Sequence, residues 1–376
     1  MVSNNGKKKL VVLQLTGGND YLNCVVPYTN EHYYDGRPAI RVPQEDVIPL
    51  DDHVGFHPAM EPMKELFDQG DMAIIHGVGY PNPSRSHFRS MDIWHTCEPD
   101  KVATEGWLGR ALREIDPKGE NVVGGVNFGG VLPRALACPG VPIASVNDLD
   151  NYGLLTSMAE NEQRKEALEV FSRMYTPTIG KGWVGDYLGK TGINALKGAD
   201  ILRSSLDTYS STVEYADNPI GKNLKSIAQV MFADVGTRVF YTSHGSFDTH
   251  TGELATHNNL WTEVSRAVMD FYADLKEHDA QEDVILLMFS EFGRRLKDNG
   301  SGTDHGQAGV AFVIGATVKG GMYSGYPSLH PSDLIEGDPI YSLDFRGVYS
   351  DILENWLHVD PVPIVEGQFE KPNVLI

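Results

Sequence analysis

Residues 10–20 read LVVLQLTGGND and combine a continuous apolar run with a pair of glycines and a polar end. An apolar run of this length, bounded by glycines, predicts a strand that is buried on both faces, as in a parallel sheet. Asp20 then follows directly after the carboxyl end of this strand. In open α/β sheets ligands bind just outside the carboxyl ends of the strands, so Asp20 is a candidate functional residue.

The alternation of apolar strand and amphipathic helix continues along the chain. Further strands are predicted over 72–78, 236–243, 283–289 and 309–315, and helices over 58–70, 86–95 and 253–275, with a last helix capped by Ser342. Strands that alternate with helices indicate an α/β fold with a mainly parallel central sheet. We interpret the whole chain, residues 1–376, as a single domain.

Residues 156–231 differ from the rest because they are mostly helical and polar, and we interpret them as a helical insertion. The insertion leaves the sheet after one set of edge loops and returns just before the strand at 236–243. It is therefore predicted to cap the carboxyl edge of the sheet and to limit which substrates enter. The alternative is that it forms a packing layer against the flank of the sheet.

Composition excludes several classes of protein. The chain of 376 residues has 51 acidic and 31 basic residues, which gives a net charge of −20. Such a charge repels nucleic acid and anionic membranes, so neither is an expected partner. No apolar run reaches the roughly 18 residues that a membrane span needs. Three cysteines without a CxxC motif indicate neither a disulfide scaffold nor a structural zinc site.

The first predicted strand begins within ten residues of Met1, which leaves no room for a signal peptide. As written, the chain is expected in the cytoplasm. A chain from which an export leader had been removed would look the same, and would then be periplasmic or exported.

Candidate metal ligands are concentrated after the predicted strands. The stretch 244–257, HGSFDTHTGELATH, holds three histidines, an aspartate and a glutamate, and burying such groups is costly unless a partner ion offsets the cost. Asp248 and His250 follow one strand, Glu291 follows another, and the segment 83–87 (PSRSH) follows a third. Together with Asp20 these groups would meet at one edge of the sheet, as expected of a metallohydrolase. For each residue alone, a loop or capping role is the alternative.

Several of the candidates have a second interpretation. His257 is in phase with the apolar stripe of the helix at 253–275, so it is either a ligand or a packed histidine. Ser86 is either a nucleophile at a helix N-terminus or a helix cap. Arg85 and Arg294 are candidate clamps for an anion, although arginines on loops are usually solvated.

Seven short motifs occur in an order that points to a known family. They are GGND (17–20), PSRSHF (83–88), GWLGR (106–110), FDTH (247–250), SEFGR (290–294), TDHG (303–306) and DFR (344–346). In this order, and over nearly the whole chain, they resemble the bacterial domain-of-unknown-function family numbered 1501. That family looks like a branch of the alkaline phosphatase and sulfatase superfamily. The resemblance implies an α/β/α sandwich with a two-metal site that cleaves or transfers phosphate or sulfate esters.

The resemblance also implies roles for individual residues. Asp20 matches the aspartate after the first strand that ligates one metal, and Asp248 with His250 resembles the pair on the other metal. Glu291 stands where the superfamily has an aspartate, Phe292 stands where it has a histidine, and His305 resembles the last histidine ligand. The phenylalanine weakens one metal site, unless His87 compensates from the facing loop.

The nucleophile that the resemblance implies is not evident. Residues 81–85, PNPSR, fit the sulfatase pattern Cys-x-Pro-x-Arg with proline in place of cysteine, which leaves Ser84 or Ser86 as substitutes. The cofactor is expected to be a divalent metal; zinc, manganese or iron suits mixed carboxylate and imidazole ligands better than calcium, with magnesium also open. The expected function is metal-dependent hydrolysis of a small or glycan anionic ester. The alternative is a non-catalytic binding or scaffold protein.

Overall fold

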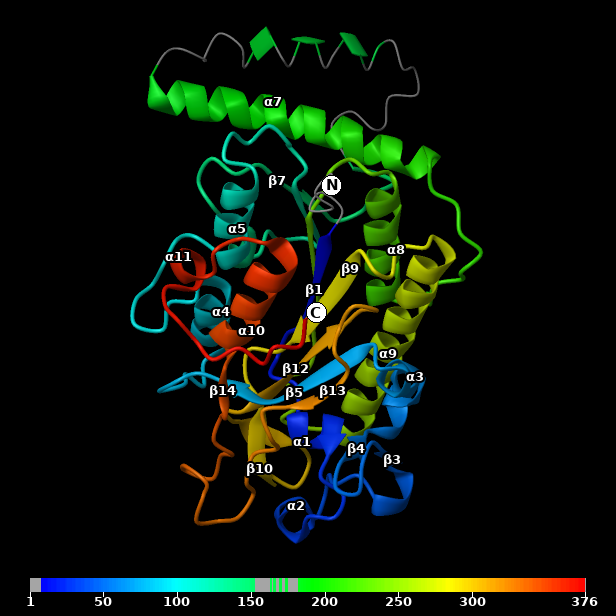
Figure 1. Ribbon diagram of the computed structural model, residues 1–376, viewed down its shortest axis with the longest axis vertical. Helices are drawn as coiled ribbons and strands as arrows, with labels where there is room; N and C mark the ends of the chain where they lie inside the picture. The colour runs from blue at the N-terminus through cyan, green and yellow to red at the C-terminus, as the bar shows by residue number, and fades with distance from the viewer. Residues whose placement is uncertain are drawn as a thin grey trace.

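The computed structural model describes residues 8–152 and 182–375, together with a few positions between 163 and 174. A nine-stranded sheet forms the centre, with the strand order β13-β5-β12-β9-β1-β8-β6-β7 and β14 paired to β5 (Figure 1). Its strands are β1 (Lys9–Leu15), β5 (Met72–Gly79), β6 (Gly125–Phe128), β7 (Ile143–Val146), β8 (Val239–His244), β9 (Val284–Phe289), β12 (Gly309–Ile314), β13 (Gly321–Tyr323) and β14 (Leu343–Asp344). The expected mainly parallel sheet is confirmed.

The segment that opens the chain lies at the middle of this sheet. β1 pairs in parallel with β8 on one side and with β9 on the other. Its residues alternate between two apolar clusters, with Val11 and Leu13 in one cluster and Leu10 and Val12 in the other. Because both faces of the strand are covered, its sequence is apolar throughout.

One strand departs from the parallel arrangement. β12 runs antiparallel to both β9 and β5, so β5 itself has the same direction as β1. The amino end of β12 therefore lies at the edge where the other strands end. This reversal brings the residues just before β12 to the carboxyl edge.

Helices cover both faces and complete an α/β/α sandwich. The first apolar cluster takes residues from α3 (Glu61–Gln69), α8 (Pro219–Phe232) and α9 (Glu253–Glu277). The second takes residues from α4 (His87–Thr96), α5 (Trp107–Ile115), α10 (Phe345–Asp351) and α11 (Val362–Val365). The predicted helices at 58–70, 86–95 and 253–275 are present. The last helix is capped by the Asp344 side chain, which accepts from the Arg346 amide, and not by Ser342.

The carboxyl edge is elaborated by short elements. After β1 come α1 (Tyr21–Cys24), α2 (Glu31–Gly36) and a small antiparallel sheet of β2 (Val25–Val26), β3 (Ile48–Pro49) and β4 (Gly55–Phe56). After β9 comes a hairpin of β10 (Arg294–Asp298) and β11 (Thr303–His305). Short 3-10 and π-type turns complete the described elements: Gln44–Asp46, Pro58–Met60, Arg134–Leu136, Ser205–Asp207 and Ile352–Leu357. The described helices include none long and apolar enough to span a membrane.

The predicted insertion is helical where it is described, but it is not a cap there. α7 (Trp183–Ser204) lies at the end of the molecule opposite β10 and α2 (Figure 1). A Cβ added at Gly198 of α7 would meet Val123, which precedes β6 and so marks the amino edge of the sheet. α8 packs against α9 on the flank, with Leu224 and Ile227 in the core. The packing-layer alternative describes these helices, and most of residues 156–181 lie outside the described residues.

Candidate metal centre

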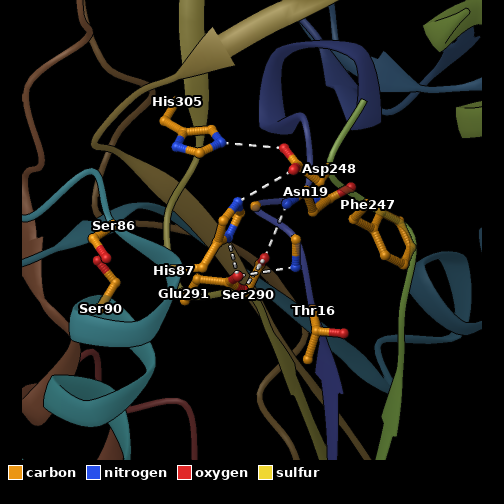
Figure 2. A network of polar contacts seen from close by, with 12 residues as sticks. Thr16, Asn19, Ser86, His87, Ser90, Phe247, Asp248, Ser290, Glu291 and His305 are labelled. Atoms are coloured by element: carbon orange, nitrogen blue, oxygen red, sulfur yellow. Dashed lines mark hydrogen bonds and ion pairs between the residues drawn. The ribbon is translucent and has the colours of Figure 1, made fainter. Parts of the chain in front are cut away.

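Three segments far apart in the sequence meet at the carboxyl edge of the sheet (Figure 2). His87 is the first residue of α4, Asp248 and His250 follow β8, and His305 ends β11. Among the described residues, His87, Asp248 and His305 form a cluster whose possible ligand atoms all lie within 4.8 Å of one another. His250 joins them through its Nε2 atom, which lies 3.0 Å from Asp248 Oδ1.

A glycine pair allows this close approach. Gly17 and Gly18 follow β1 with φ of +121° and +75°. A Cβ at Gly17 would lie 2.4 Å from the Asp248 amide nitrogen, and one at Gly18 would lie 2.3 Å from the Phe292 ring. Residues with a side chain would therefore push the loop after β8 and the loop after β9 away from β1. The GG of the opening segment sets the spacing of the cluster.

The Nε2 atoms of the three histidines face the same carboxylate. His305 Nε2 lies 3.1 Å from Asp248 Oδ1, and His87 Nε2 lies 3.4 Å from Asp248 Oδ2. The Nε2 atoms of His250 and His305 are only 2.9 Å apart. In a tetrahedral zinc site with metal–ligand distances of about 2.0–2.1 Å, the ligand atoms lie roughly 3.3 Å from one another. The separations of 2.9–3.4 Å are close to that spacing, and the possible ligand atoms of His87, Asp248 and His305 all lie within 4.8 Å of one another.

The opposite ring nitrogen of each histidine faces an acceptor. His305 Nδ1 lies 2.7 Å from the Arg85 carbonyl oxygen, which can only accept, so Nδ1 carries the proton. His87 Nδ1 lies 2.8 Å from Glu291 Oε1, which also accepts from the Gly17 amide. In the neutral rings the Nε2 lone pairs of His87 and His305 then point at Asp248. This arrangement fixes the tautomer that binds a metal.

The third histidine, His250, has an acidic neighbour at ion-pair distance, which is longer than the hydrogen bonds of His87 and His305. Its Nδ1 atom lies 3.5 Å from Asp304 Oδ1. The Nε2 lone pairs of His87 and His305 and the Asp248 carboxylate repel one another unless protons or a cation lie between them. The chemistry of the donors therefore fits a divalent ion, and the residues that would hold it are His87, Asp248, His250 and His305.

Charges around the cluster keep the carboxylate ionised. Although partial burial alone would raise it, the Arg294 guanidinium and the neighbouring histidines hold the pKa of Asp248 at about 2. The hydrogen bond to Glu291 raises the pKa of His87, and burial lowers the pKa of His305. The side chains of Asp248 and His250 are 43% and 41% exposed, so solvent and a small substrate can reach this face.

Glu291, a predicted ligand, and its neighbour Phe292 support the cluster from behind. Glu291 is buried and orients His87, while its second oxygen faces the Ser290 hydroxyl at 3.2 Å. Phe292 is also buried, and its ring centroid lies 4.9 Å from those of both His87 and His305. The phenylalanine fills the space beside two ligands. Among the described residues one group, His87, Asp248 and His305, could hold a metal ion, whereas the resemblance implies a two-metal site.

Asp20 is not brought to the cluster. Its side chain is fully buried, caps α1 and pairs with Arg37 Nη1 at 2.5 Å. A guanidinium at that distance neutralises the carboxylate and repels a second cation. Burial and the neighbouring Asp20 raise the pKa of Glu253, whose carboxyl group accepts from Asn23 and Thr303. The group around Asp20 is therefore structural and lies under the loop that carries His305.

His257 is packed inside the protein. Its Nε2 atom contacts Asn19 Oδ1 and Trp261 Nε1, each at 3.2 Å, and burial lowers its pKa to about 3. This outcome matches the interpretation in which His257 belongs to the apolar stripe of α9.

The predicted anion clamps are already engaged. Arg294 is buried, donates to the carbonyl oxygens of Gly18 and Thr303, and pairs with Asp248 at 2.7 Å. The Arg85 guanidinium pairs with Asp338 at 2.7 Å. The Arg294 guanidinium is fully buried among protein acceptors, whereas the Arg85 side chain remains 31% exposed.

The serines lie beside the cluster. Ser84 Oγ accepts from the Ser86 amide, and the exposed Ser86 is the N-cap residue of α4, although its side chain makes no capping bond. In Figure 2, Ser86 and Ser90 are drawn to one side, and no dashed line joins them to the network. Neither position presents a nucleophile among the four ligands.

Two supporting residues were not assigned from sequence. Asp304 stands next to His305 in the TDHG motif, so its position beside a predicted ligand could have indicated a supporting role. Asp338 left no signal, because its contact with Arg85 joins positions 253 residues apart. The buried Asp338 carboxylate fixes the loop whose carbonyl orients His305.

We therefore expect Asp338→Asn to weaken metal binding by about tenfold, because residues that orient a metal ligand typically contribute 10–100-fold to affinity. The matched control is Glu336→Gln, since Glu336 also contacts Arg85 but its side chain is 72% exposed. Titration of the metal-free proteins with zinc against a chromophoric chelator checks this. Equal losses of zinc affinity in the two variants would show that Asp338 does not support the metal centre.

Comparison with known proteins finds a family model that matches part of this chain. Residues 193–333 match the model of a protein family of unknown function, DUF1501. The resemblance noted from the sequence motifs is thereby confirmed, and the DUF1501 region contains Asp248, His250 and His305. No curated protein matches the chain.

Three of the solved structures that are similar to this chain come from different kinds of protein. The PsFucS1 sulfatase from Pseudoalteromonas sp. is 12% identical, covering 96% of this chain and 68% of its own, with a TM-score of 0.39. An alkaline phosphatase superfamily protein from Vibrio parahaemolyticus is 11% identical, with coverages of 84% and 62% and a TM-score of 0.35. The soluble domain of lipooligosaccharide phosphoethanolamine transferase A from Neisseria meningitidis is 11% identical, with coverages of 82% and 77% and a TM-score of 0.37. These similarities carry no information on substrate.

Proposed function

We propose that this protein is a hydrolase of phosphate or sulfate esters that uses one divalent metal ion held by His87, Asp248, His250 and His305. One observation carries the proposal: the three histidines direct Nε2 at the same carboxylate, while the Nδ1 atoms of His87 and His305 are hydrogen-bonded to acceptors. The mixed nitrogen and oxygen donors suit zinc, manganese or iron better than calcium or magnesium.

The geometry favours water over a serine as the nucleophile. When bound, a divalent ion supplies Lewis-acid chemistry, activating water and neutralising charge on an ester oxygen. The protein's own residues hold the ion and keep the imidazoles in the required tautomer. Phe292 shields one side of His87 and His305, and the exposed faces of Asp248 and His250 leave the other side open to an ester.

Metal loading and turnover test the proposal together. The protein is stripped with a chelator, reloaded separately with zinc, manganese, iron(II), calcium or magnesium, and assayed for bound metal and for hydrolysis of aryl phosphates, phosphodiesters and aryl sulfates. We expect about one transition-metal ion per chain, and turnover of one ester class that is lost on chelation and restored on reloading. Protein that takes up no metal would refute the proposal.

Two further outcomes separate the alternatives. Metal uptake without turnover of any ester would favour the non-catalytic binding protein, in keeping with Phe292 and with the serines that lie outside the cluster. Ser86→Ala distinguishes the nucleophiles: retained turnover supports activated water, whereas loss of turnover with metal still bound assigns the reaction to the serine.

A further inference from the structure

A cavity of about 490 Å³ lies along α4, the helix whose first residue is the proposed ligand His87. The helix presents His87 to the metal cluster, and the very next residue, Phe88, lines the cavity. The opposite wall comes from Val102 and from Arg134, which begins the short 3-10 turn after β6. The cavity and the cluster therefore share the first turn of one helix.

Part of the wall of the cavity is apolar and exposed, although Ser86, Asp92 and His95 also line it. The side chains of Phe88 and Val102 are 86% and 74% exposed, and Met91 lines the wall one helical turn after His87. Large apolar side chains that gather around a hollow and remain exposed commonly mark a ligand-binding surface.

The rim of the cavity is positively charged, in contrast to a chain with a net charge of −20. Arg89 and Arg134 both line the cavity, and both pair with the single carboxylate of Asp92. Two guanidinium groups around one carboxylate leave a net positive charge, which attracts an anionic molecule.

We infer that the substrate is an anionic ester with an aromatic-sized apolar group, which lies against Phe88 while the phosphate or sulfate group binds at the metal centre. This inference rests on the proposed function and names its substrate class. Three features support an anionic ester with an apolar group. The cavity shares a helical turn with a proposed metal ligand, part of its wall is apolar, and its rim is cationic.

A sugar fits the cavity less well than an aromatic group. Sugar hydroxyls need hydrogen-bond partners, and Phe88, Met91 and Val102 offer none. Arg89 already donates to Asp92 and to the carbonyl oxygens of Glu98 and Pro99. The hydrogen-bonding capacity of the rim is therefore partly used within the protein.

Binding of phosphonates tests the inference without requiring turnover. Zinc-loaded full-length protein is titrated calorimetrically with 1-naphthylphosphonate, methylphosphonate and glucose 6-phosphate. We expect 1-naphthylphosphonate to bind about tenfold more tightly than methylphosphonate, which corresponds to partial burial of one aromatic group. Phe88→Ala should remove this preference, because the variant lacks the ring against which the naphthyl group would lie. The Phe88 side chain is exposed, so its loss leaves the core intact.

The matched control is Val184→Ser on α7, a 48% exposed residue at the opposite edge of the sheet, which should keep the preference. Equal binding of the two phosphonates, or a preference that survives Phe88→Ala, overturns the inference while the metal centre stands. Tighter binding of glucose 6-phosphate that depends on Phe88 overturns it in favour of a glycan. Failure to bind zinc removes the proposed function, and the inference falls with it.

Discussion

Replacing Asp248 with asparagine should abolish metal binding, lowering the affinity by more than about 100-fold. Residues that only orient a ligand contribute 10–100-fold, and a direct ligand should exceed that. Asp248 is the only carboxylate among the four proposed ligands, and it also neutralises the buried Arg294 guanidinium at 2.7 Å. In the variant the ion loses an anionic ligand and faces an uncompensated positive charge. Zinc titration against a chromophoric chelator, with metal content measured in parallel, gives the affinity.

Asp304→Asn is the matched control for Asp248→Asn. Asp304 is 58% exposed and contacts the outer nitrogen of His250, so its loss should reduce affinity by about tenfold or less. If Asp248→Asn kept an affinity within a few-fold of the unmodified protein, the assignment of the metal centre would be wrong.

Replacing Arg37 with methionine should cost about 3–5 kcal/mol of unfolding free energy, because it leaves a buried carboxylate without its partner. The side chains of Arg37 and Asp20 are both fully buried. Arg37 also donates to the carbonyl oxygens of Arg295 and Leu296, which would lose their donors. Denaturant unfolding of the metal-free protein measures the loss, separately from any effect on the metal.

Arg41→Met supplies the comparison, since Arg41 is exposed and its change should stay within about 0.5 kcal/mol. The double variant Asp20→Asn with Arg37→Met should recover part of the loss, because the unpaired charge is gone. An Arg37→Met protein as stable as Arg41→Met would show that Asp20 is not held by this pair.

The strands and the functional edge could be predicted because they depend on local patterns. Apolar runs mark β1, β5, β8 and β9, and the polar groups that follow these strands do lie at their carboxyl ends. His305 is different, since it comes before a strand. It reaches the same edge only because β12 runs antiparallel, and a run of apolar residues contains no sign of strand direction.

The roles of the individual carboxylates were not predictable for a similar reason. Asp20, Asp248 and Glu291 all follow strands, and sequence alone treats them alike. Contacts with residues distant in the sequence distinguish their roles. Arg37 forms an ion pair with Asp20, whereas Glu291 is hydrogen-bonded to His87. Such pairings depend on rotamers and on distant loops, which motif spacing does not specify.

The four proposed ligands belong to three segments that lie far apart in the sequence. An ion held by them would act as a removable cross-link, present in the native chain and absent from the unfolded one. Its binding free energy would then add to the stability of the native state according to the supply of free metal. A shortage of metal would thus shorten the lifetime of the protein through exposure to proteases, as well as silencing its chemistry.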